Sequence, residues 1–272
     1  MKSLYLKQYD AIIRYHQIPG NGSPLVFLAG LNFSSTANFM DIASHPLIRE
    51  RGALLIDYLG AGHSETTQNI KLSLQDHAST IAAVLDNEGL TDCVLVGFSM
   101  GGTVGIFLAK MRPEIISHLI VFEANISPGG GDGTKLIASY DEEIFVASVF
   151  PEILADFRRK AVKGDVESAI LAGGWGISDP RGIHASSVAL VELDDNFAAS
   201  YFAMDMRRTF LVGELSLPMN SEAAKPDAPL PEELRTHGIE VIVVPNVGHL
   251  GILTKPDLFT EIFANCLRND AI

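Results

Sequence analysis

The residues of this chain best suited to covalent chemistry surround Ser99, in the run Gly-Phe-Ser-Met-Gly at 97–101. The short apolar run Cys93–Val96 comes before it and predicts a buried parallel strand. The residues after it have helical apolar spacing as far as Pro113. G-x-S-x-G between a strand and a helix is the pattern of a nucleophile elbow, in which glycines leave room for a strained turn. We therefore expect Ser99 to present its Oγ as a nucleophile.

A nucleophilic serine needs a base and donors for the negative charge that develops during reaction. His249 stands in the loop after the predicted strand Val241–Val244, which makes it the expected general base. The N–H of Met100, at the start of the predicted helix, is the first expected oxyanion donor. The N–H of Leu31, after the predicted strand Leu25–Leu28, is the second. Of the other histidines, only His63 is expected near the site.

These residues must be carried by strands that end at one edge of a sheet. The buried apolar runs are Leu25–Leu28, Ala53–Asp57, Cys93–Val96, Leu119–Phe122, Thr209–Gly213 and Val241–Val244. Helical patterns separate them, including one opened by a Ser73–Asp76 capping box and a last one near Pro256. Residues 3–17 suit an antiparallel hairpin at the sheet edge. The alternation predicts an α/β fold with a mostly parallel, doubly wound sheet.

One long segment interrupts this alternation. The glycine-rich run Pro128–Gly133 predicts a hinge, and residues 134–205 show helical patches without buried strands. We therefore expect a core of residues 1–125 and 206–272 and an inserted, mostly helical cap at 126–205. Part of the apolar face of the cap is expected to line a substrate pocket, and its residues are Phe145, Phe150, Trp175, Phe197, Tyr201, Phe202 and Met204.

Composition narrows the class of protein. With 33 acidic and 20 basic residues the formal net charge is −13, which argues against nucleic-acid and anionic-membrane partners and leaves a small-molecule substrate. Two cysteines do not make a disulfide framework, and no metal-ligand spacing is present, so no metal or cofactor is expected. Neither a secretion signal nor a run of transmembrane length is evident, which predicts a cytoplasmic protein. The oligomeric state stays open.

Taken in order, the motifs resemble those of the α/β-hydrolase family over nearly the whole chain outside the cap. The resemblance is carried by Gly30-Leu31, by residues 57–64 (Asp-Tyr-Leu-Gly-Ala-Gly-His-Ser), by 97–101 and by Gly248-His249. The chain departs from the family pattern at three places. Ala29 replaces a usual histidine, Leu59 replaces a frequent arginine, and Ser216 stands where many members have the acid of the triad.

The resemblance implies a carboxylate that orients His249, and with Ser216 at the usual position it must come from elsewhere. Glu123 and Glu214 each follow a predicted buried strand, and a cap residue such as Asp194 or Asp195 is a third possibility. Some family members carry the acid after the sixth strand, the position that Glu123 occupies. A carboxylate at a buried strand end also needs a partner, which His249 would supply. These points favour Glu123.

The expected activity is hydrolysis of a small or medium, fairly apolar carboxylic ester by a Ser-His-Glu triad through an acyl-enzyme. The same residues also suit other acyl chemistry, namely thioester, amide or carbon–carbon bond hydrolysis, or acyl transfer. A third interpretation is a non-catalytic ligand receptor, because fold alone does not determine function. Chemistry that needs an aspartate nucleophile is disfavoured, since residue 99 is serine.

Overall fold

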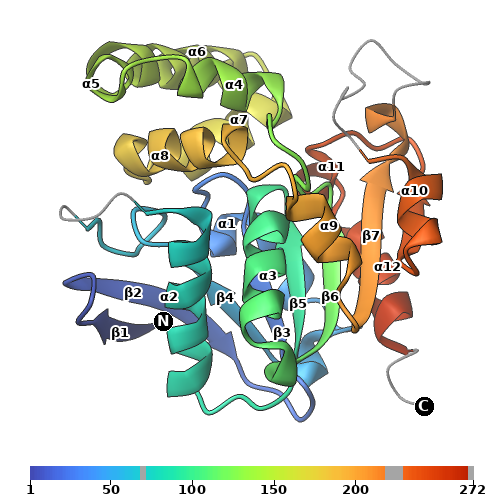
Figure 1. Ribbon diagram of the computed structural model, residues 1–272. Coiled ribbons are helices and arrows are strands. Elements are labelled where there is room, and N and C mark those ends of the chain that lie inside the picture. Colours follow the sequence, from blue (N-terminus) through green and yellow to red (C-terminus); the bar gives the residue numbers. More distant parts are fainter. Residues whose placement is uncertain (68–71, 218–228, 269–272) are drawn as a thin grey trace.

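A mixed sheet runs through the centre of the molecule, with helices on both faces (Figure 1). The structure is a computed structural model that describes residues 1–67, 72–217 and 229–268. Within these residues the sheet has eight strands, in the order β1-β2-β4-β3-β5-β6-β7-β8. In chain order the strands are β1 (Lys2–Leu6), β2 (Ala11–Ile18), β3 (Leu25–Leu28), β4 (Ala53–Ile56), β5 (Cys93–Phe98), β6 (Ile116–Phe122), β7 (Arg207–Gly213) and β8 (Glu240–Val244).

The strand directions bring the ends of six strands to one edge. β1 and β2 form the predicted antiparallel hairpin, and β2 is also antiparallel to β4, whereas the strands from β4 across to β8 are parallel. Leu28 pairs with Gly97, and Phe122 pairs with Phe98 on one side and Leu211 on the other. The structure therefore confirms the predicted α/β fold class, and residues that follow these strands meet at one edge.

Helices cover both faces of this sheet. α2 and α3 pack on one face, and α1 and α12 pack on the other (Figure 1). The helices of the core, outside the segment between β6 and β7, are α1 (Ser35–Ala43), α2 (Leu74–Asn87), α3 (Met100–Met111), α10 (Pro231–Thr236), α11 (Gly251–Thr254) and α12 (Pro256–Arg268). α2 begins with the capping box that its sequence predicts, since the Ser73 hydroxyl accepts from the Asp76 N–H and the Asp76 carboxylate accepts from the Ser73 N–H.

The chain between β6 and β7 is helical, as its sequence pattern predicts. Its helices are α4 (Asp132–Ala138), α5 (Glu142–Ile144), α6 (Phe150–Val162), α7 (Val166–Trp175), α8 (Pro180–Val191) and α9 (Phe197–Phe202). α4 to α8 stand over the carboxyl ends of the strands (Figure 1). α9 instead packs on α3, where the rings of Phe197 and Phe107 lie 4.7 Å apart. The segment expected as a cap therefore includes one helix that belongs to the layer beside the sheet.

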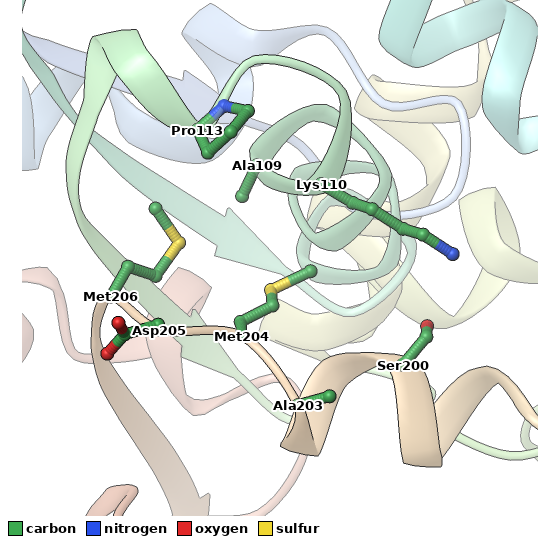
Figure 2. A pocket seen from close by; sticks show the side chains of 8 residues that line it. All are labelled: Ala109, Lys110, Pro113, Ser200, Ala203, Met204, Asp205 and Met206. Atoms are coloured by element: carbon green, nitrogen blue, oxygen red, sulfur yellow. The ribbon is translucent and has the colours of Figure 1, made fainter.

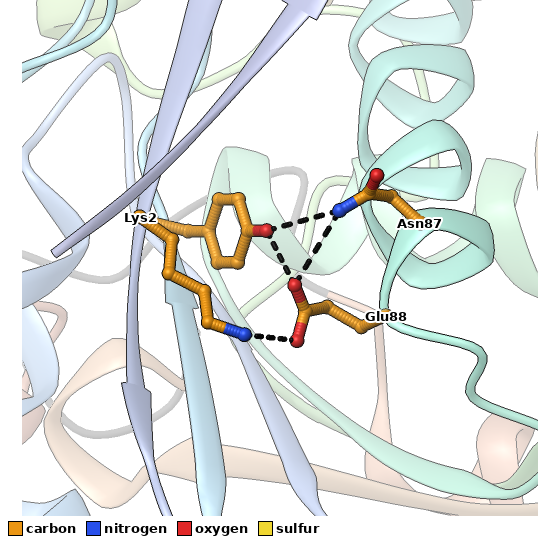
Figure 3. Close-up of polar contacts among 4 residues, drawn as sticks. Lys2, Asn87 and Glu88 are labelled. Atoms are coloured by element: carbon orange, nitrogen blue, oxygen red, sulfur yellow. Dashed lines mark hydrogen bonds and ion pairs between the residues drawn. The ribbon is translucent and has the colours of Figure 1, made fainter.

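Four residues attach the N-terminal hairpin to α2 (Figure 3). The Lys2 ammonium donates to Oε2 of Glu88 at 2.6 Å, and the Tyr15 hydroxyl donates to Oε1 of the same carboxylate at 2.5 Å. The side-chain amide of Asn87 donates to the Tyr15 hydroxyl at 3.3 Å. A two-stranded hairpin is weakly stable alone, so these bonds add to the pairing of β2 with β4 in holding it in place.

Two predictions from the sequence concern a membrane-spanning segment and the proline-rich connection after β7. Among the described residues, the structure has no helix of the length and apolarity needed to cross a bilayer. The proline-rich connection after β7 is described in part. Pro231 starts α10, whereas Pro218 and Pro226 lie outside the described residues.

Candidate active site

Ser99 joins β5 to α3 in a strained turn. Its backbone angles, a φ of 52° and a ψ of −123°, lie in a region that residues other than glycine rarely adopt. A Cβ at Gly101 would lie 2.0 Å from the carbonyl oxygen of Leu28, and one at Gly97 would lie 2.6 Å from that of Gly101. The two glycines of the sequence motif are therefore required by close backbone packing around the serine.

His249 lies between Ser99 and Glu123. Its Nε2 is 3.1 Å from Ser99 Oγ, and its Nδ1 is 2.6 Å from Oε2 of Glu123. The Glu123 side chain is only 4% exposed and that of His249 28%. An ionised carboxylate only accepts hydrogen bonds, so Nδ1 carries the ring proton and the unprotonated Nε2 accepts from the Ser99 hydroxyl. This is the arrangement that a general base requires.

Glu123 is held at the end of β6 by contacts with β7. Its φ is 48°, and its N–H donates to the carbonyl of Leu211 at 3.0 Å. Its Oε1 accepts from the N–H of Gly213 at 2.9 Å, which leaves Oε2 for His249. A Cβ at Gly213 would lie 3.0 Å from that Oε1 and 2.3 Å from the carbonyl oxygen of Val247. The glycine at the end of β7 therefore provides both the hydrogen bond and the room for this carboxylate.

The other carboxylates considered from the sequence lie elsewhere. Oε2 of Glu214 accepts from the N–H of Asn246 at 2.9 Å, at the start of the loop that carries His249. Asp194 and Asp195 are exposed, and Asp194 accepts from the N–H of Asn196 at 2.6 Å. The ring nitrogens of His249 are within hydrogen-bond distance of Ser99 and Glu123, so Glu123 is the carboxylate that the structure brings to the imidazole.

A cavity of about 280 Å³ opens beside Ser99 and His249. Its lining comes from the ends of β3, β5 and β6, from α4 and α7, and from the His249 loop and α11. The residues are Gly30, Leu31, Phe33, Phe98, Ser99, Asn125, Gly131, Asp132, Gly133, Thr134, Leu171, Trp175, His249, Leu250 and Leu253. Sequence reasoning singled out Trp175 as one of several cap aromatics but missed Phe98, whose ring lies 5.1 Å from that of His249.

The two expected oxyanion donors come from different segments of the chain. Met100 is the first residue of α3, and Leu31 lines the cavity. The neighbouring N–H of Gly30 donates to Oδ1 of Asn38 at 2.9 Å, so it is committed to the protein. Leu31, the next residue, stays the expected second donor beside Met100.

His63, which the sequence predicts near the site, is not among the residues that line the cavity. Its side chain is exposed, and its ring lies 6.4 Å from the ring of His16. Its N–H donates to the buried carboxylate of Asp57 at 2.8 Å, and Asp57 also accepts from the N–H of Ser35 at 2.7 Å. Burial raises the pKa of Asp57, and these two N–H groups oppose the rise. We interpret this loop as a structural support.

A second cavity, of about 410 Å³, lies between the end of α3 and the α9–β7 connection (Figure 2). Its lining residues are Ala109, Lys110, Pro113, Ser200, Ala203, Met204, Asp205 and Met206. None of the residues with an expected catalytic role is among them. The hydroxyl of Ser200 donates to the carbonyl of Phe197, as is usual on a helix. The chemistry therefore belongs to the cavity beside Ser99.

Known proteins share the fold of this chain and parts of its sequence. Residues 25–262 match the family model described as the alpha/beta hydrolase family. The chain is 25% identical to the putative carbamate hydrolase RutD of Azorhizobium caulinodans over 91% of its own length and 92% of that protein. It is 26% identical to the sn-1-specific diacylglycerol lipase ABHD11 of Mus musculus over 60% of its length. That match spans about half of the mouse protein, 52% of its length.

Solved structures share the fold at lower identity. An esterase from Thermogutta terrifontis superposes with a TM-score of 0.77 at 19% identity and covers 99% of both chains. The enol-lactonase of Burkholderia xenovorans LB400 has a TM-score of 0.73 at 17% identity and covers 98% of this chain and 100% of its own.

Proposed function

The chain belongs to the α/β-hydrolase family, and from that premise we propose that it hydrolyses small or medium, fairly apolar carboxylic esters through an acyl-enzyme. The observation that carries the proposal is the hydrogen-bond chain from Ser99 Oγ through His249 to the buried carboxylate of Glu123. A serine, a base within 3.1 Å and a buried acid that orients the base together form an activated nucleophile.

In the first half of the proposed reaction, Ser99 Oγ attacks the ester carbonyl carbon while Nε2 of His249 takes the hydroxyl proton. The charge that develops on the carbonyl oxygen is stabilised by the N–H groups of Met100 and Leu31, each of which contributes about 3 kcal/mol if it resembles measured donors. Glu123 stabilises the imidazolium that forms. The C–O bond then breaks, the alcohol leaves with the proton from Nε2, and the acyl group stays on Ser99.

In the second half, water replaces the alcohol. His249 takes a proton from the water, whose oxygen attacks the acyl carbon, and the same N–H groups hold the second oxyanion. The Ser99 C–O bond breaks, Oγ recovers the proton from Nε2, and the carboxylic acid leaves. One turnover consumes one ester and one water, releases one alcohol and one carboxylic acid, and returns Ser99 and His249 to their starting protonation.

The substrate class is inferred from the cavity. Leu171, Trp175 and Leu253 give it an apolar wall, and about 280 Å³ holds an acyl chain of modest length. The similarity to an esterase and a lipase supports ester hydrolysis. The similarity to a putative carbamate hydrolase over most of the chain gives a second candidate, a carbamate, from the alternative acyl chemistry. We also propose a cytoplasmic location, because the chain uses only two cysteines, both buried.

The test is a panel of p-nitrophenyl esters from acetate to palmitate, together with a p-nitrophenyl carbamate. We expect turnover of the shorter esters and labelling of Ser99 by a fluorophosphonate probe. Ser99→Ala should reduce turnover by about 10⁴ to 10⁶ and abolish labelling. Ser200→Ala, in the second cavity, is the matched control and should retain both. Labelling that survives Ser99→Ala contradicts the assignment of Ser99 as the nucleophile. Ligand binding by the wild type without any turnover favours the alternative of a non-catalytic ligand receptor.

A further inference from the structure

Two side chains from the segment between β6 and β7 hold the backbone of the loop that carries Leu31. The indole Nε1–H of Trp175, the last residue of α7, donates to the carbonyl of Leu31 at 2.9 Å. The hydroxyl of Ser178 donates to the carbonyl of Asn32 at 2.6 Å. The same hydroxyl lies 3.2 Å from the carbonyl of Gly174, but its contact with Asn32 is the shorter one. Consecutive carbonyls of one loop are thus bound by residues about 145 positions later in the chain.

The peptide unit that carries the Leu31 N–H is held by one hydrogen bond within the loop and by contacts on the two neighbouring peptide units. The carbonyl of Gly30 accepts from the N–H of Phe33 at 3.0 Å. In a trans peptide the N–H of Leu31 points opposite to that carbonyl. Its direction therefore follows the tilt of the Gly30–Leu31 peptide plane. Asn38 Oδ1 accepts from the N–H of the preceding peptide unit, and Trp175 donates to the carbonyl of the following one, so both neighbours of this plane are held and limit its tilt.

The conformation of the loop is strained. Asn32 has a φ of 49°, and its fully buried side-chain amide has no hydrogen-bond partner among the described residues. Packing on α7 adds to the hydrogen bonds. The rings of Phe33 and Trp175 lie 6.1 Å apart, and a Cβ at Gly174 would lie 2.2 Å from the Phe33 ring. A strained loop persists only where its surroundings hold it, and here α7 does so.

We infer that Trp175 and Ser178 are positioning residues for the oxyanion site: through the carbonyls of Leu31 and Asn32 they keep the Leu31 N–H aimed at the charge that develops in the transition state. The inference rests on the proposed function. It makes α7 a determinant of the rate of reaction as well as a wall of the pocket.

The test uses Trp175→Phe, which keeps an aromatic ring beside Phe33 and removes the N–H. We expect kcat to fall about 5- to 20-fold with little change in KM, because the lost contact acts on the transition state. The affinity for an alkyl trifluoromethyl ketone, which forms a tetrahedral oxyanion adduct with Ser99, should fall by a similar factor. Ser178→Ala should give the same pattern without changing the cavity lining.

Phe157→Leu is the matched control. The Phe157 ring lies 5.9 Å from the Trp175 ring, and its side chain makes no hydrogen bond to the loop. We expect its kcat and ketone affinity to stay near those of the wild type. Trp175 is the single tryptophan, so its emission spectrum in the Ser178→Ala and Phe157→Leu proteins verifies that the indole remains buried.

If Trp175→Phe changes KM and chain-length preference but leaves kcat and ketone affinity unchanged, Trp175 only lines the cavity and the inference is wrong. If Ser178→Ala also retains both, the inference fails independently of how the tryptophan variant folds. Failure of the proposed function looks different, because the wild type itself then shows neither ester turnover nor fluorophosphonate labelling.

Discussion

The Glu123 carboxylate, at the end of β6, reaches Nδ1 of His249 at 2.6 Å, although β7 lies between β6 and the strand that precedes His249. The acid crosses one strand of the sheet to do so. Glutamate is one methylene longer than aspartate, and Gly213 at the end of β7 has no side chain in the path. This relationship supports the proposed triad, in which Glu123 takes the place of an acid at the position of Ser216.

The first prediction tests the acid. Glu123→Gln keeps the size of the side chain but loses the charge, so we expect turnover to fall by up to about 10⁴. Glu214→Gln should be nearly silent, because an amide oxygen still accepts the N–H of Asn246. Steady-state kinetics of the two variants decide the matter. A severe loss of turnover in Glu214→Gln with a mild one in Glu123→Gln would identify Glu214, the residue after β7, as the acid instead.

The second prediction concerns the room that β7 leaves for that acid. Gly213→Ala places a Cβ 3.0 Å from Oε1 of Glu123 and 2.3 Å from the carbonyl of Val247. We expect a loss of turnover and of about 1–3 kcal/mol in the free energy of unfolding. Gly173→Ala, at an exposed helical site with nothing within 4 Å, is the control and should leave both unchanged or slightly improved. Normal kinetics in Gly213→Ala would show that the carboxylate has more space than the structure indicates.

The third prediction concerns acyl-chain length. Leu171 lines the cavity from α7, so Leu171→Ala should enlarge it and shift the preferred p-nitrophenyl ester toward longer chains. We expect kcat/KM for the longer esters to rise relative to acetate by about 10-fold or more, since each methylene in an apolar pocket is worth about 1 kcal/mol or more. Leu136→Ala, an exposed position on α4, is the control. An unchanged profile in Leu171→Ala would place the acyl chain elsewhere.

The fourth prediction concerns stability below neutral pH. Burial lowers the pKa of His77 to about 4 from an ordinary value of 6.5. The folded chain therefore keeps this imidazole neutral over a range in which the unfolded chain binds a proton. The stability present above pH 6.5 is lost as the pH falls toward 4, by up to about 3 kcal/mol.

Thermal unfolding of the wild type and His77→Phe from pH 7.5 to 4 measures this contribution. The phenylalanine keeps a ring beside Tyr58, whose centroid lies 4.9 Å from that of His77. We expect Tm to depend less on pH in the variant over this window. If Tm depends on pH equally in the two proteins, His77 is not the group that causes the loss of stability.

The fifth prediction concerns the attachment of the N-terminal hairpin to α2 (Figure 3). Burial acts to raise the pKa of Glu88, but hydrogen bonds from Lys2 and Tyr15 outweigh it, so the pKa lies below its ordinary value. The stability that this shift provides is present above about pH 4.5 and is lost as the pH falls below it.

Tyr15→Phe removes one of these bonds and should lower the free energy of unfolding at pH 7 by about 1 kcal/mol, measured with urea. Glu114→Gln, which breaks an exposed pair with Arg112, is the control and should change little. Equal stability of the wild type and Tyr15→Phe would show that the Tyr15 hydroxyl contributes nothing to holding the hairpin.

Local patterns in the sequence were sufficient to predict the parallel strands, the helices between them and the strained turn at Ser99. Each of these features depends on residues close together in the chain. A buried parallel strand is a short apolar run, a helix has its own apolar spacing, and the elbow needs glycines two positions from the serine. Because parallel strands end at one edge, the position of His249 after a strand also indicated its proximity to Ser99.

The tertiary structure decided the features that depend on distances between strands and layers. Glu123 and Glu214 both follow a buried strand. Only the placement of β6, β7 and β8, with no side chain at Gly213, brings Glu123 to His249. The bond from Trp175 to Leu31 joins residues 144 positions apart. No local pattern contains such a contact, because packing between helix and sheet determines it and many sequences satisfy the same apolar spacing.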